Sequence, residues 1–465
     1  MADLLSILSG AQTSLAAQRG LTATASNNID NANNPDYSRQ IATVEALVPA
    51  DQSGGVYIGR GATLSTVTQA RDRFLEAQLP QAFGDAAQST AQSDALQALH
   101  ALDPGTSGGL DTAISAFYSS LTALAQNPSD SGLRTAALGS ASAMAQAFNR
   151  TAQQIQAARS GLDAQAAGLA TTVDSEAAAV AQLNAQIAQA GTAGGPPNDL
   201  LDLRQKHLDQ LATLTGATPV QTSNGEVNVV LANGVTLVAG ARAGSLSTAP
   251  DPTNGGHLQI TLTLPDGSGP VALPGGALSG SLGGTLAARD GALATAGSRV
   301  DQLAWDLAGA LNAAHEAGYG LDGSTGHPLL DVGSTVTGAA GAMAVAISDP
   351  AQLATAATSG APGDATNANA LVATQSTPVA GGADVQSALS GIVSQFGAAT
   401  ATAKAFADQD GALKDQLTSM RDSYSGVSID DEMISIQAAQ RGYEAIAKVI
   451  ETADQMMQTV IAMIP

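Results

Sequence analysis

The fold of this chain is decided by residues 428–464, which read SIDDEMISIQAAQRGYEAIAKVIETADQMMQTVIAMI. Ser428 is a favourable N-cap, and three acidic residues in the first turn oppose the positive end of the helix dipole. Apolar residues then recur at spacings of three and four, which is the pattern of a coiled-coil seam. The stretch predicts one amphipathic helix that needs a partner, with a seam of Met433, Ile436, Tyr443, Ile446, Ile450, Met457, Val460 and Ile464.

A matching pattern lies near the other end of the chain, in residues 4–29. An Asn-rich stretch followed by Pro35 ends this helix, because Asn tolerates a left-handed cap and Pro disfavours helix in the residue before it. The first residues lack a basic region and a continuous apolar core, so we expect neither a cleaved signal peptide nor a membrane span. We expect the two terminal helices to pair as a coiled coil, and the N-terminal side of this assembly interface to be Leu4, Leu8, Ala11, Leu15 and Ile29.

Composition limits the possible functions. The chain has 465 residues, enough for about three domains. It has no cysteine, so it folds without disulfides. Its formal net charge is −22, and its 18 basic residues are scattered. Because nucleic acids and anionic membranes attract concentrated positive charge, we expect neither as a partner.

Periodicity between the two ends predicts a mainly α fold with a β-rich insertion. Long Ala- and Gln-rich helical segments fill most of residues 70–216, as in an elongated helical bundle. Asn224-Gly225 and Asn233-Gly234 then punctuate short alternating strands, and both dipeptides favour tight hairpin turns. Helix resumes after Gly283-Gly284 and again from Val385. The predicted domains are 1–69 with 425–465, a terminal-helix assembly domain with an extended segment; 70–216 with 283–317 and 385–424, the helical bundle; 217–282, a small β-hairpin domain; and 318–384, an irregular Gly-, Ala- and Thr-rich insertion.

Candidate catalytic or metal-binding residues are few. The acidic group Asp430-Asp431-Glu432 is explained more simply by the helix dipole than by acid–base chemistry. Five histidines are not spaced as metal ligands, and the loop between the last two lacks the repeated acids of a calcium site; they are His100, His207, His257, His315 and His327. No nucleophile elbow or phosphate-binding glycine loop is present. We therefore expect no enzyme activity, no catalytic residue, no cofactor and no metal.

Residues 26–40, SNNIDNANNPDYSRQ, resemble the N-terminal signature of flagellar rod, hook and hook-associated proteins, although Asp36 stands where a glycine is usual after the proline. Residues 440–443 and 447–456, QRGY and AKVIETADQM, resemble the other end of those proteins. Residues 425–433, SGVSIDDEM, and interior motifs such as 198–202, NDLLD, are similar to the FlgK family of hook-associated proteins.

The resemblance implies a structural component of the bacterial flagellum, exported unfolded by the flagellar type III apparatus and located outside the cell. Such a protein would form a ring of identical copies through its terminal helices and would join the hook to the filament. Its implied partners are hook protein, a second junction protein and an export chaperone at the C-terminal helix. Two alternatives remain, namely a hook or distal-rod protein, and a ligand-binding or enzymatic module carried on the β insertion.

Overall fold

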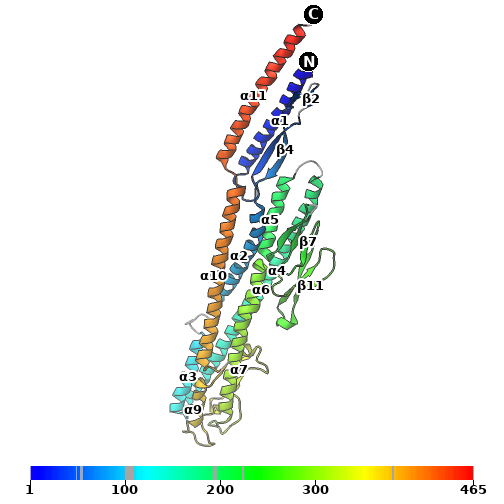
Figure 1. Ribbon diagram of the computed structural model, residues 1–465. Coiled ribbons are helices and arrows are strands. Elements are labelled where there is room, and N and C mark those ends of the chain that lie inside the picture. Colours follow the sequence, from blue (N-terminus) through cyan, green and yellow to red (C-terminus); the bar gives the residue numbers. More distant parts are fainter. Residues whose placement is uncertain are drawn as a thin grey trace.

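The computed structural model describes residues 2–48, 50–52, 56–99, 109–191, 196–222, 225–379 and 382–463. Figure 1 shows an elongated molecule in which both termini lie at one end and the chain runs to the far end and returns. The α-helices are α1 (Ala2–Asp30), α2 (Arg73–Gln97), α3 (Leu110–Gln126), α4 (Ser131–Ala190), α5 (Asn198–Thr215), α6 (Gly280–Ala288), α7 (Ala294–Glu316), α8 (Ala339–Ala342), α9 (Thr366–Ala373), α10 (Val385–Ser425) and α11 (Ile429–Ala462), and a π-helical turn, η3 (Arg289–Leu293), joins α6 to α7.

The strands form small antiparallel sheets. A hairpin of β1 (Gln40–Ala46) and β4 (Ala62–Gln69) lies beside α1, with a bulge between Thr43 and Val44. The short pair β2 (Ala50–Gln52) and β3 (Val56–Ile58) extends it. The remaining strands are β5 (Thr218–Gln221), β6 (Val227–Val230), β7 (Thr236–Ala239), β8 (Arg242–Ala243), β9 (Ser245–Pro250), β10 (Leu258–Thr263), β11 (Val271–Ala272), β12 (Leu330–Asp331) and β13 (Ala344–Val345).

The mainly α fold with a small β insertion is confirmed. Sheets β5-β6-β7-β8 and β11-β10-β9 make up this insertion and pack on one side of the bundle. Gly225 and Gly234 have φ of +84° each, the left-handed geometry that their turns require. Asn224 lies outside the described residues.

The long helix α4 is the spine of the molecule. Its first half contributes Met144 and Phe148 to a core shared with α3, α7, α9 and α10. Its second half contributes Val173 and Val180 to another core shared with α5, α6 and the β insertion. Asp130 begins α4 by accepting a hydrogen bond from the Leu133 N–H. One continuous helix therefore carries both cores.

The start of α6 differs from the sequence-based expectation, and the start of α5 involves a contact with another element. Helix α6 begins at Gly280, so Gly283 and Gly284 lie inside it. A Cβ on Gly284 would lie 2.2 Å from the Gln88 oxygen of α2, so only glycine allows α6 to pack this closely on α2. Pro197, not Asn198, is the N-cap of α5, since the Asn198 side chain instead donates to the Val67 oxygen at 2.9 Å.

The irregular segment 318–384 is integrated into the far end of the bundle. Its short elements bury Leu329, Leu330, Met343, Leu353 and Leu371 in the same core as α3 and α7. The segment is irregular, as its composition predicts, but its apolar residues close the core. The sequence pattern did not predict these core residues, because each lies in a turn or a short element that has little apolar periodicity.

Candidate assembly interface

The two terminal helices pack side by side along their length (Figure 1). Helix α11 begins as expected, with Ser428 Oγ accepting from the Asp431 N–H at 3.3 Å. At mid-length the Gln18 side chain lies against Gly442, where a Cβ would approach it to 2.9 Å. All five α1 residues predicted for the seam are partly buried, and so are the α11 residues Ile436, Ile446, Ile450, Met457 and Val460.

One predicted seam residue, Met433, lies largely outside the pair, Tyr443 lies at its edge, and Ile464 is not described. Met433 is 45% exposed. Its neighbour Glu432 is buried instead, and the Glu432 carboxylate contacts Arg39 Nε at 2.7 Å. Tyr443 is 37% exposed; its hydroxyl lies 3.4 Å from Arg19 and its ring lies under that guanidinium. The place of Met433 in the assembly interface therefore stays a prediction, because its side chain is exposed in the single chain. Ile464 lies outside the described residues.

The opposite face of α1 rests on the β1–β4 hairpin. Ser14 Oγ accepts from the Ala62 N–H at 3.0 Å. Gly61, with φ of +89°, sits so close to the helix that a Cβ there would lie 2.3 Å from the Gly10 oxygen. The hairpin therefore holds α1 through close backbone packing, while α1 presents its seam to α11.

The Asn-rich segment forms the joint between the terminal helices and the bundle. The Asn28 side chain donates to the Gln40 oxygen at 2.9 Å and accepts from the Gln40 N–H at 2.9 Å and from the Tyr37 hydroxyl at 2.8 Å. The Arg39 N–H donates to the Ser425 oxygen at 2.8 Å, where α10 ends. The sequence indicated only that this segment ends a helix. In the structure it also connects the end of α1, the start of β1 and the end of α10.

Ion pairs continue the joint into α5 and α10. Arg71 contacts Asp202 at 2.9 Å and Glu76 at 3.0 Å. Arg421 of α10 contacts Asp209 of α5 at 3.3 Å. Burial raises the pKa of Asp209 to about 6, against the lowering effects of Gln205 and Arg421. These side chains line a cleft of about 310 Å³, whose polar groups pair with one another across the joint.

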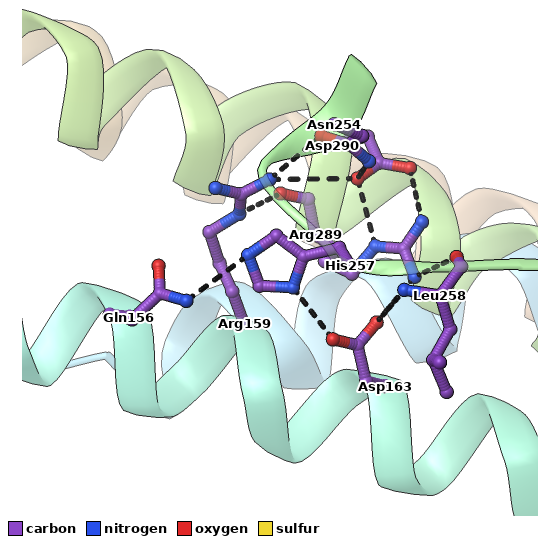
Figure 2. A network of polar contacts seen from close by, with 8 residues as sticks. All are labelled: Gln156, Arg159, Asp163, Asn254, His257, Leu258, Arg289 and Asp290. Atoms are coloured by element: carbon purple, nitrogen blue, oxygen red, sulfur yellow. Dashed lines mark hydrogen bonds and ion pairs between the residues drawn. The ribbon is translucent and has the colours of Figure 1, made fainter. Parts of the chain in front are cut away.

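A second polar network fastens the β insertion to the spine, and Figure 2 shows it. Asp163 of α4 meets His257 Nδ1 at 2.6 Å and Arg289 of η3 at 2.5 Å. Arg289 also donates to the Leu258 oxygen at 2.7 Å, while Arg159 donates to the Arg289 oxygen at 3.1 Å. Burial alone would raise the pKa of Asp163, but hydrogen bonds from His257 and Arg289 outweigh it and lower the pKa.

This Asp–His pair does not present a nucleophile. The second ring nitrogen of His257 faces the Gln156 amide at 3.3 Å, so no hydroxyl or thiol occupies the position that a catalytic triad requires. The network instead joins α4, β10 and the π-turn. Arg289 and Asp290 are neighbours in the sequence, but the partners of Arg289 in α4 and β10 could not be predicted from it.

Two further residues considered for metal binding, His315 and Asp322, have structural partners. His315 Nδ1 donates to the His327 oxygen at 2.7 Å and its Nε2 accepts from the Ala354 N–H at 3.0 Å, so both ring nitrogens are engaged. Asp322 accepts from Ser324 in its own turn. Within the described ranges, no group of three His, Cys, Asp or Glu side chains is placed to hold a metal ion. Nor is any helix there long and apolar enough to cross a membrane.

The chain is elongated and helical, and its paired terminal helices lie at one end of the molecule. This is the architecture of a structural assembly protein. The helical domain of the flagellar hook-associated protein FlgK matches residues 96–330. The C-terminal region of the flagellar basal body rod proteins FlgEFG matches residues 421–463. The chain belongs to the FlgK family of flagellar hook-associated proteins, and its role is structural.

Individual relatives agree. Flagellar hook-associated protein 1 of Escherichia coli K12 is 27% identical over 98% of this chain and 99% of that protein. The protein of the same name from Salmonella typhimurium is 31% identical over 71% of this chain and 60% of its own length. The fold is similar to that of the flagellar hook junction protein FlgK from Burkholderia pseudomallei, with a TM-score of 0.69 at 19% identity over 76% of this chain and 100% of that chain.

Proposed function

We propose that this chain joins the hook to the filament of a bacterial flagellum, as a ring of identical copies held together through its terminal helices. The observation that carries the proposal is the α1–α11 pair, which buries one seam and leaves Val449 and Met456 exposed on α11 and Met463 exposed at its C-cap. A helix pair this apolar on its outer side gains stability when neighbouring helices cover it.

The proposed partners follow from the family. Hook protein would contact one end of the ring and a second junction protein the other. The chain would leave the cell through the flagellar type III apparatus without a cleaved signal peptide, with an export chaperone covering α11 beforehand. We propose that the chain has no enzymatic activity. We also propose that 1–69 with 425–465 is the assembly domain, and that 70–424 carries the bundle and both insertions.

Seam variants test the assembly mechanism. Ile450→Asp and Leu8→Asp each place a charge in the α1–α11 contact, where burial without a partner costs several kcal/mol. We expect both variants to disappear from isolated hook–filament structures and to abolish motility, while circular dichroism shows a folded bundle. Gln455→Asp, an exposed change on the same helix, is the control and should assemble normally. Normal motility in both seam variants would contradict the mechanism.

Electron microscopy of a strain that lacks the gene tests the location. Complete hooks without filaments, with filament protein released into the medium, are the expected result. Missing or malformed hooks would assign the chain to the hook or distal rod instead. Intact filaments would direct attention to the β insertion as the site of another function.

A further inference from the structure

Helix α10 has three distinct faces beyond residue 400. One face packs on α2 and includes the buried Ala403. A second face carries exposed charged side chains at spacings of four and seven, namely Lys404, Asp408, Asp415 and Asp422. The third face carries Phe406, Leu413, Met420 and Tyr424, which we call the α10 stripe.

The α10 stripe is apolar and exposed along its whole length. Its four side chains are 46–55% exposed and are spaced by seven, seven and four residues, so the helical period places them in one line about 27 Å long. Gln409, Gln416 and Ser423 lie beside them on the same face and are uncharged. Since the charged face already gives α10 a solvated side, four large apolar residues on another side indicate a surface that another protein covers.

We propose that the α10 stripe is a lateral contact between neighbouring copies of this chain. The contact rests on the ring of identical copies proposed above, and it extends that interface from the terminal helices to the bundle. It is a heterologous contact, in which the stripe of one copy meets a different surface of the next, as ring closure requires.

Charge favours a second copy as the occupant. Each copy has a net charge of −22, so two copies repel wherever their acidic surfaces meet. The α10 stripe is a charge-free face on a helix whose exposed acids lie on another side. It is therefore a surface on which a like-charged neighbour can approach closely.

Direction distinguishes a lateral neighbour from an axial one. Figure 1 shows α10 running along one side of the molecule, with α11 continuing beyond it after a connection of only three residues, Gly426–Ser428. If the long axis of each copy runs along the axis of the ring proposed above, a surface parallel to it faces the neighbouring copies, whereas hook and filament components meet the ends of the ring. A neighbour that packs along α11 is positioned to continue along α10.

Photo-crosslinking in assembled flagella tests the proposal. Tyr424 is replaced by the photoreactive aromatic p-benzoylphenylalanine, and isolated hook–filament structures are illuminated. We expect an adduct of this chain with itself, at twice its mass of 45.9 kDa. The same replacement of Asp415, on the charged face, is the matched control and should give little of this adduct. Adducts only with another flagellar protein, or a self-adduct no stronger than the control, would overturn the proposal.

Charge insertion provides an independent measurement. Leu413→Glu places a carboxylate on the stripe, and Ala401→Glu places one at an exposed position outside it. We expect Leu413→Glu to lower the amount of chain retained on isolated hooks about tenfold or more, as for a central interface residue, with unchanged helicity. Equal retention of the two variants would also overturn the proposal.

Failure of this inference is separable from failure of the junction role. A deletion strain with complete hooks and no filaments, combined with no self-adduct at position 424, would remove the stripe contact alone. A deletion strain with intact filaments would remove the junction role itself.

Discussion

Arg134 is 1% exposed and donates to main-chain oxygens of Pro128, Pro350 and Leu353 and to the hydroxyl of Thr355. This guanidinium pins the irregular segment to the start of α4. Arg134→Met leaves several buried carbonyls unpaired, and we expect it to lower the free energy of unfolding by about 3 kcal/mol in urea denaturation. Arg299→Met, an exposed change on α7, should stay within about 0.5 kcal/mol. Equal effects would mean that the contacts of Arg134 add no stability.

His315 gives the fold an acid sensitivity. Burial lowers its pKa below the ordinary value near 6.5, more strongly than the hydrogen bond to the His327 oxygen raises it. Below pH 6.5 the unfolded chain therefore binds a proton that the folded chain does not bind, so stability is present above this pH and is lost as the pH falls. We expect wild type to lose up to about 1.4 kcal/mol per pH unit relative to His315→Gln.

Denaturation of both chains between pH 7.5 and 5.5 measures the difference. Asp209, whose pKa is raised to about 6, acts in the opposite direction and stabilises the fold as the pH falls, but it is common to both chains and cancels. Parallel curves for wild type and His315→Gln would contradict the assignment.

At the scale of elements, the joint depends on one amide. The Asn28 side chain is 1% exposed and bonds both backbone groups of Gln40, which fixes the strand β1 to the end of α1. Asn28→Ala leaves these groups unpaired, and we expect a loss of about 2 kcal/mol of local stability. Hydrogen exchange of residues 26–48 should accelerate by at least about tenfold. Asn33→Ala, an exposed neighbour, should leave exchange unchanged, and equal exchange in the two variants would contradict this role.

At the scale of the whole molecule, the terminal helices stand outside both hydrophobic cores. The buried residues of the two cores run from Leu96 to Ala403, whereas the buried apolar residues described in α1 and α11 are small alanines such as Ala25 and Ala453. A fragment of residues 70–424 should therefore fold alone, with a midpoint of thermal unfolding within about 5 °C of the full chain. The fragment should also fail to assemble on hooks. An unfolded fragment would refute the proposed division into domains.

Much of the fold could be predicted from short-range features of the sequence. The cap at Ser428, the seam spacing of α1 and α11, the turn at Gly234 and the return to helix at Val385 could all be predicted, because each depends on neighbouring residues or on a short period. The mainly α class and the β insertion followed from the same patterns. The contact between α1 and α11 could be predicted for the same reason, since the spacing of apolar residues identifies a coiled-coil seam.

Tertiary structure decided what depends on residues far apart in the chain. Glu432 is buried and paired because Arg39 reaches it from 393 positions away. Asn28 acts as a clamp, and not only as a turn residue, because Gln40 folds back onto it. The segment 318–384 closes a core that begins at α3. By itself, the sequence determined the helices and their apolar faces, whereas only the packed chain determined which charges are paired and which apolar faces remain uncovered.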